Sequence, residues 1–232
     1  MKQTYKAVRQ FFVVLGLAII AVSGAYTALA AENAELGPCL EAAIADIETD
    51  DLSVDEAAGI LYMREEEKLA RDVYDRLGEL WGMPIFSNIA RSEETHMDAM
   101  LVLIDRYDLS DPVGDGVRGV FQDPALQSLY DDLVENGTTS LEDAFRVGAL
   151  IEELDIADLE EHLARTDNID VRIVYQNLMK GSRNHLRSFY NQLDRSGVDY
   201  EPTYLPPDEY SHIINSPRET GGAIDDPDYR FE

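Results

Sequence analysis

The amino-acid sequence is short of the features that support disulfides, nucleic-acid binding or β-structure. Cys39 is its only cysteine, so no disulfide can form within the chain and the fold must rest on its core. Only 19 of the 232 residues are Lys or Arg while 46 are Asp or Glu, and the formal net charge of −27 repels nucleic acid and favours cations. Strand-like alternation is scarce, and no internal repeat or low-complexity tract is present. A nucleic-acid-binding protein and a disulfide-stabilised fold are therefore excluded.

Residues 1–30 have the organisation of a signal peptide. Basic residues near the start precede an apolar run from 11 to 22, and the small residues of SGAYTALA follow. We expect cleavage near Ala30 and export of the mature chain to the medium, cell surface or periplasm, with an N-terminal segment over residues 31–52. The alternative is an uncleaved anchor, because apolar character continues weakly to Ala31 and roughly 20 such residues span a bilayer. Only that anchor would bring the protein to a membrane.

Helical periodicity dominates the remaining chain. Ser53 and Glu56 have the spacing of a capping box, which begins the first of four long helices. These helices are predicted over residues 53–82, about 86–107, 140–165 and 168–195. A roughly 30-residue connection, with a short helix starting at Asp123 and Pro124, separates the second from the third. That length suits a crossover that returns along the molecule, although an unstructured insertion would look the same. The prediction is an all-α fold, a ferritin-like four-helix bundle over residues 53–197, with a proline-rich tail over 198–232.

Each predicted long helix has an apolar face that polar residues interrupt near its middle. Glu65 and Glu66 fall off the inward face of the first helix and are expected to be solvated or to cap a neighbouring lysine. Glu152 is preferred over Glu153 because Glu152 falls on the inward face of its helix. With one inward position every three or four residues, the inward polar residues are Glu67, Glu93, His96, Glu152, Asp155, Ser182 and His185.

Interruptions at one depth of four helices need a physical reason, because burial of an unpaired carboxylate costs several kcal/mol and neighbouring carboxylates raise one another's pKa. A divalent metal ion removes both penalties. Carboxylates with imidazoles suit iron, manganese or zinc, and the spacing of Glu93 and His96 directs both to one point. Glu-x-x-His alone is weak evidence in so acidic a chain. We interpret the copy at Glu209 and His212 as coincidence, and His162 as a histidine at the end of the core.

Several motifs resemble known proteins. The stretches EKLARDVY and EETH resemble the first two helices of rubrerythrin-type di-iron proteins. From about Leu52 to Pro217 the chain resembles a ferritin-like family of exported prokaryotic proteins, a domain of unknown function. REEEKLARDVY, FSNIARSEETHMDAM, VGALIEELDI, GSRNHLRSF and YLPPDEY carry that resemblance. Together they are specific for the family but not for a reaction.

The di-iron pattern implies a set of metal ligands with one departure. Ser182 stands where a second Glu-x-x-His would begin, and its hydroxyl brings no negative charge. One of two ions is therefore expected to bind weakly unless Asp155, one turn after Glu152, compensates. Tyr74 is expected to hydrogen-bond a ligand. The implied ligands are Glu67, Glu93, His96, Glu152 and His185, with Asp155 as a further candidate.

These observations predict an exported metal-binding protein. Non-haem iron is the favoured metal, with manganese or zinc as alternatives, and an iron centre would oxidise Fe(II) or reduce oxygen or peroxide. The alternative is a non-enzymatic helical bundle with one structural metal ion or none. The sequence leaves open a homo-oligomer, the substrate and whether the protein is an enzyme.

Export can be tested directly on the protein recovered from its native cell. The mature chain should begin near Ala31 and be found outside the cytoplasm. Mass spectrometry of the amino terminus measures this, and intact residues 1–30 in a membrane fraction would instead establish an anchor.

Overall fold

The computed structural model describes residues 36–231, and these residues form seven helices and no strand. The all-α prediction is confirmed for this part of the chain, while the predicted signal peptide lies outside it. Four helices are long: α3 (Val54–Trp81), α4 (Pro84–Arg106), α6 (Leu141–Leu163) and α7 (Ile169–Arg195). Three are shorter: α2 (Leu36–Ile44), α5 (Pro124–Gly137) and α8 (Pro207–Asn215).

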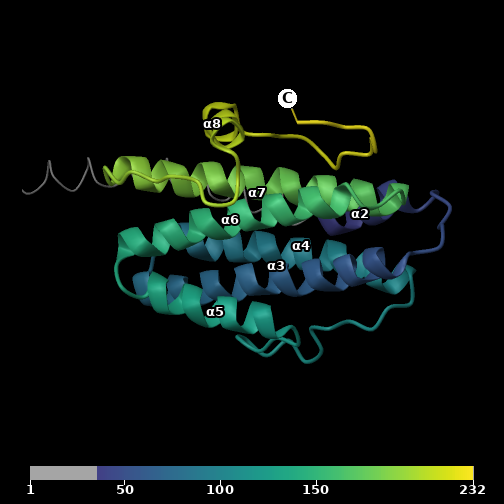
Figure 1. Cartoon of the computed structure of the whole chain (residues 1–232), viewed down its shortest axis with the longest axis horizontal. Coiled ribbons are helices and arrows are strands. Elements are labelled where there is room, and N and C mark those ends of the chain that lie inside the picture. The colour runs from purple at the N-terminus through teal and green to yellow at the C-terminus, as the bar shows by residue number, and fades with distance from the viewer. Residues whose placement is uncertain (1–35, 232) are drawn as a thin grey trace, which may run out of the picture.

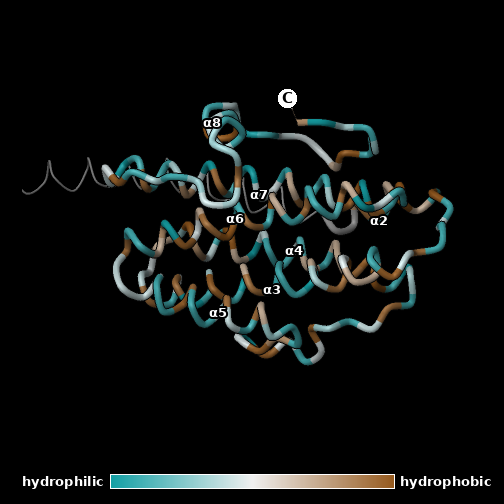
Figure 2. The backbone as a smooth tube through the Cα atoms, in the orientation of Figure 1, coloured by the Kyte–Doolittle hydropathy of each residue, from teal (hydrophilic) through white to brown (hydrophobic). Residues whose placement is uncertain are grey.

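The four long helices pack lengthwise around one core. Helix α3 lies along α4, and α6 lies along α7, each pair joined by a short link (Figure 1). Helix α3 also contacts α6, and α4 contacts α7, so the four helices close a ring. Hydrophobic residues recur along every long helix between hydrophilic ones (Figure 2), and those facing inward form a single buried cluster. Side chains at the middle of all four helices can therefore meet.

The helix boundaries follow from local capping. Ser53 and Glu56 form the predicted capping box of α3, and Gly82 ends that helix at φ 63°, a left-handed conformation that favours glycine. Ser140 accepts a hydrogen bond from the backbone N–H of Asp143 and so begins α6. Helix α4 begins at Pro84, two residues earlier than expected, because proline fits the first turn of a helix.

The connection between α4 and α6 runs along the outside of the long helices and includes α5, which packs on α3 and α6 (Figure 1). Buried polar groups of α3 hold it. Glu65 accepts hydrogen bonds from the backbone N–H groups of Gln122 (2.5 Å) and Asp123 (3.0 Å). Lys68 donates to the carbonyl of Val117 at 2.9 Å. The expectation that Glu65 is solvated is wrong, since the crossover itself covers this side chain and satisfies it.

The chain after α7 returns over the outer side of α6 and α7. Glu153 accepts hydrogen bonds from the backbone N–H groups of Thr203 (2.8 Å) and Leu205 (3.2 Å), and it is fully buried. Arg187 donates to the carbonyl of Ile213 in α8 at 2.9 Å. The two short helices α2 and α8 were not predicted, because each is brief and owes its helix to packing on the long ones. No helix of residues 36–231 combines the length and apolar character that crossing a membrane requires.

Glu56 ties the start of α3 to the link between α6 and α7, and this makes stability depend on pH. It accepts hydrogen bonds from Thr166 (2.5 Å) and Asn168 (2.9 Å) besides that from Ser53. Burial raises the pKa of Glu56, but the hydrogen bonds from Thr166, Ser53 and Asn168 outweigh it and lower the pKa from 4.5 to about 2. Ionised Glu56 therefore stabilises the fold above pH 4.5, and this contribution is lost as pH falls toward 2.

Glu56→Gln should lower the free energy of unfolding by roughly 2 kcal/mol at pH 7, because the amide lacks the charge that the three donors stabilise. The difference in free energy of unfolding between the variant and the unmodified protein should shrink as pH falls from 4.5 toward 2. Urea denaturation at several pH values measures it. Glu142→Gln, which changes an exposed first-turn acid of α6, is the control and should have a much smaller effect. An equal effect of the two substitutions would contradict this role of Glu56.

Candidate metal centre

The six predicted ligands are all buried where the four long helices meet. Helix α3 contributes Glu67, α4 contributes Glu93 and His96, α6 contributes Glu152 and Asp155, and α7 contributes His185. None of them is more than 5% exposed. Helical spacing puts Glu93 and His96 on one face of α4, and Glu152 and Asp155 on one face of α6. The structure thus brings together side chains that lie more than a hundred residues apart in the sequence.

Five of these six side chains form two groups that share Glu93, and Asp155 belongs to neither group. In the first group, the Nδ1 atom of His96 lies 2.8 Å from Glu93 Oε2 and 3.2 Å from Glu67 Oε2. In the second, the Nδ1 atom of His185 lies 2.9 Å from Glu93 Oε1 and 3.4 Å from Glu152 Oε2. Within each group the potential ligand atoms all lie within 4.8 Å of one another. Each oxygen of Glu93 therefore faces a different histidine.

Several atoms of this cluster are buried without a hydrogen-bond partner. They are Glu67 Oε1, Glu93 Oε1, Asp155 Oδ1 and His185 Nδ1. Glu93 Oε1 and His185 Nδ1 are close, yet no hydrogen bond joins them. Buried polar atoms are normally paired, and an unpaired group is costly. Oxygen and imidazole lone pairs that converge on a shared space are what a divalent cation requires, so the residues fit a metal ion.

Neighbouring side chains hold the candidate ligands in place. Ser92 contacts Nε2 of His185 at 2.9 Å, which leaves Nδ1 toward the carboxylates. The hydroxyl of Tyr74 donates to Glu152 Oε1 at 2.5 Å, in the position expected of it. Gly181 leaves room for His96, because a Cβ atom there would overlap the imidazole ring. Sequence reasoning missed Ser92 and Gly181, although a small residue next to Ser182 on the fourth helix was a signal for close packing.

Without a cation, the surrounding carboxylates keep both histidines protonated at neutral pH. Burial alone lowers the pKa of His185, but Glu93 and Glu152 outweigh it and raise that pKa to about 10. His96 follows the same pattern with Glu67 and Glu93, and its pKa rises well above the usual range. Burial raises the pKa of Glu67 to about 7 despite His96 nearby. A metal ion bound at neutral pH must therefore displace protons from both histidines.

Ser182 and Asp155 are directly hydrogen-bonded. The serine hydroxyl donates to Asp155 Oδ2, and both side chains are buried. Burial and the charge of Glu67 raise the pKa of Asp155 well above its usual range. The departure from the di-iron pattern is thus accompanied by a carboxylate from the facing helix. Asp155 lies where it can supply the charge that Ser182 lacks.

The prediction that Glu66 is solvated is wrong. It is 2% exposed, and both of its carboxylate oxygens lack a hydrogen-bond partner. Burial and then the charges of Asp155, Asp158 and Glu67 raise its pKa well above 4.5. The inward face of α3 is wider than one position in three or four, because α6 covers its flank. Glu66 belongs to neither of the two groups that share Glu93.

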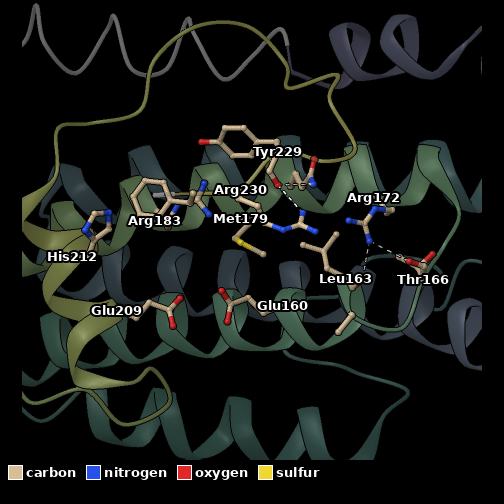
Figure 3. Close-up of a pocket in the computed structure, with 13 residues that line it drawn as sticks. Glu160, Leu163, Thr166, Arg172, Met179, Arg183, Glu209, His212, Tyr229 and Arg230 are labelled. Carbon is tan, nitrogen blue, oxygen red and sulfur yellow. Dashed lines mark hydrogen bonds between the residues drawn. The ribbon is translucent and has the colours of Figure 1, made fainter.

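A separate pocket of about 810 Å³ lies between α6, α7, α8 and the C-terminal segment (Figure 3). Glu160 and Glu209 point toward one another in it, with Arg183 and Tyr229 on the opposite side (Figure 3). None of the six predicted ligands lines this pocket. Glu209 and His212 line it but belong to neither metal-ligand group found among residues 36–231.

Comparison with known proteins identifies relatives. Residues 56–217 match the model of an uncharacterized protein domain, DUF2202. The uncharacterized protein MJ0754 of Methanocaldococcus jannaschii is 52% identical over 170 residues, which are 73% of this chain and 92% of that protein. A crystal structure of hypothetical protein MJ0754 aligns with a TM-score of 0.74 at 50% identity, and the alignment covers 75% of this chain and 99% of the solved one. The predicted resemblance to a domain of unknown function is confirmed.

The helix phase of the cluster can be tested by metal content. Glu93→Gln should abolish binding of divalent metal ions, because both groups lose their shared carboxylate, and His96→Ala should weaken it. Glu94→Gln should keep the metal, because Glu94 points outward and pairs with Arg71 at 2.8 Å. Elemental analysis of protein purified without chelators measures this. Loss of metal in Glu94→Gln but not in Glu93→Gln would show that the outward face binds it.

Proposed function

Because the chain belongs to the DUF2202 family of uncharacterized protein domains, its activity has to be argued from its own site, and we propose that it is a ferritin-like protein that binds two divalent metal ions. The single observation that carries this proposal is the pair of three-ligand groups that share Glu93. A carboxylate with one oxygen toward each histidine is suited to bridge two cations.

The charge balance supports two ions. Glu67, Glu93, Glu152 and Asp155 are four carboxylates that bury four negative charges when ionised, and two divalent cations neutralise them. Each group also offers one neutral imidazole nitrogen when its histidine loses its proton. Carboxylates with imidazole suit non-haem iron best, and manganese or zinc also fit.

The helix arrangement supports the ferritin-like assignment. A short link joins α3 to α4, another joins α6 to α7, and a long crossover through α5 joins the two pairs. This is the connectivity of ferritin-like folds. In that class the ligands come from all four helices, as the candidate residues do here. The carboxylate expected from the fourth helix comes instead from Asp155 on α6, against Ser182 of α7.

Iron at this centre would supply one-electron chemistry. We propose that the protein oxidises Fe(II), with dioxygen or hydrogen peroxide as the electron acceptor. Two ferrous ions would give up two electrons, which with two protons reduce one hydrogen peroxide to two waters or one dioxygen to one hydrogen peroxide. Glu93 and the two histidines would hold the ions, and Tyr74 keeps Glu152 oriented through its hydrogen bond. Export of the mature chain is part of the proposal and rests on the sequence of residues 1–30.

Anaerobic titration with Fe(II), followed by addition of peroxide or air, tests the proposal. Two ions should bind per chain, and the ferrous ions should be oxidised faster than in buffer, with the absorption of an oxo-bridged ferric pair. One zinc ion per chain without redox change would support a structural site instead. Absence of any bound metal would contradict the proposal.

The contact between Ser182 and Asp155 sharpens a second test. Asp155→Ala should lower iron stoichiometry toward one, since it removes one of the four carboxylates that balance the charge of two ions. Ser182→Glu in the presence of Asp155 should destabilise the protein, because it sets two carboxylates side by side in a packed interior.

The double variant Asp155→Ala with Ser182→Glu should regain the second ion, because it moves the carboxylate to the fourth helix. Iron titration of the three variants and of the unmodified protein measures this. Full binding of two ions by Asp155→Ala would show that Asp155 is not a ligand.

A further inference from the structure

Glu66 is the buried acid of α3 that neither the metal groups nor the packing accounts for. It adjoins Glu67 in sequence and is 2% exposed, and both oxygens are without a hydrogen-bond partner. The strongest electrostatic influences on it come from three other carboxylates, Asp155, Asp158 and Glu67. An ionised carboxylate buried among other carboxylates destabilises the fold unless a cation binds to it.

The residues around Glu66 form a line from the outside to the centre. Asp158 is half-buried on α6, three residues after Asp155, so the two carboxylates lie on one face of that helix. Tyr62, four residues before Glu66 and also half-buried, donates its hydroxyl to Asp158 Oδ2 at 3.2 Å. Asp155 in turn accepts a hydrogen bond from Ser182. Burial raises the pKa of Asp155, and Glu67 and Glu152 of the metal groups are near enough to raise it further. Carboxylates thus succeed one another from the rim, at Asp158, through Glu66 to Asp155.

We propose that Glu66 is an entry site for divalent cations, through which they pass from Asp158 to the centre formed by Glu67, Glu93 and their partners. This inference rests on the proposed metal-binding function. Glu66 has no histidine beside it among the groups that face it most strongly, and it belongs to neither three-ligand group. A site of this kind binds a cation briefly, without the set of ligands that would retain it.

The alternative occupant of Glu66 is a proton shared with Asp158. That arrangement satisfies the carboxyl group but gives it no part in metal uptake. Kinetics distinguish the two roles, because an entry site accelerates both arrival and departure of the ion and leaves its final affinity unchanged. A structural role changes stability without that pattern.

Stopped-flow mixing with Co(II) tests the proposal, since its absorption reports binding without oxidation. Glu66→Gln should slow both association and dissociation of Co(II) about tenfold or more, within the range by which local charge accelerates association. The equilibrium stoichiometry and affinity should not change. Asp158→Asn should slow both rates in the same direction by a smaller factor. Glu94→Gln removes the same charge from an exposed position and should leave both rates unchanged.

The outcomes separate this inference from the proposed function. Co(II) rates in Glu66→Gln equal to those of the unmodified protein would overturn the entry site, as would loss of an ion at equilibrium, which would make Glu66 a resting ligand. Both results leave the two-metal proposal standing. Failure of the unmodified protein to bind Co(II), Fe(II) or any other divalent ion would overturn both. Thermal unfolding confirms folding, because the isosteric amide removes a repulsive charge without a change of volume.

Discussion

Buried negative charge is the constraint on which the rest of this structure depends. A helical bundle is stabilised by apolar side chains in its interior, and each ionised carboxylate placed there opposes folding unless it is hydrogen-bonded or paired with a cation. This chain places a whole layer of carboxylates there, and Glu67, Glu93 and Glu152 are each no more than 2% exposed. Two histidines between them compensate part of the charge as ion pairs, because the effect of burial on the pKa of both imidazoles is outweighed by the carboxylates, which raise it. The unpaired lone pairs that remain define where a metal ion fits.

The same constraint organises the segments outside the long helices. Glu65 is buried but accepts the backbone N–H groups of Gln122 and Asp123, so the crossover lies against α3 at this point. Glu153 accepts those of Thr203 and Leu205, so the tail crosses α6 there. Lys68 and Asp72 pair at 2.6 Å, and Lys68 also donates to the crossover carbonyls. The acids that backbone N–H groups satisfy hold these segments in place, whereas the candidate ligands at the centre accept no hydrogen bond from a backbone N–H group of residues 36–231.

The four long helices, their capping and the residues at the centre of their inward faces could be predicted because they depend on local sequence. Ser53, Glu56 and the regular spacing of apolar residues predict α3, and the interruption of four apolar faces at one depth predicts a shared polar layer. The burial of Glu65, Glu66 and Glu153 could not be predicted, since it depends on segments roughly fifty or more residues away that cover those side chains. Periodicity assigns a residue to one face of a helix, but packing decides how many faces are covered. A long helix with neighbours on several sides has few solvated positions in its middle.

Ser182 marks the one position at which the proposed centre departs from the di-iron pattern. The di-iron pattern implies a carboxylate on the fourth helix. The serine found there is smaller and carries no negative charge. Asp155 of the facing helix lies against this serine, whose hydroxyl donates a hydrogen bond to it, and Asp155 is the carboxylate that we propose in place of the missing one. Helix α6 then carries two candidate ligands one turn apart, Glu152 and Asp155. Since Asp158 continues that row toward solvent, carboxylates extend along α6 from the centre to the rim, and the buried Glu66 of α3 is under the electrostatic influence of both Asp155 and Asp158.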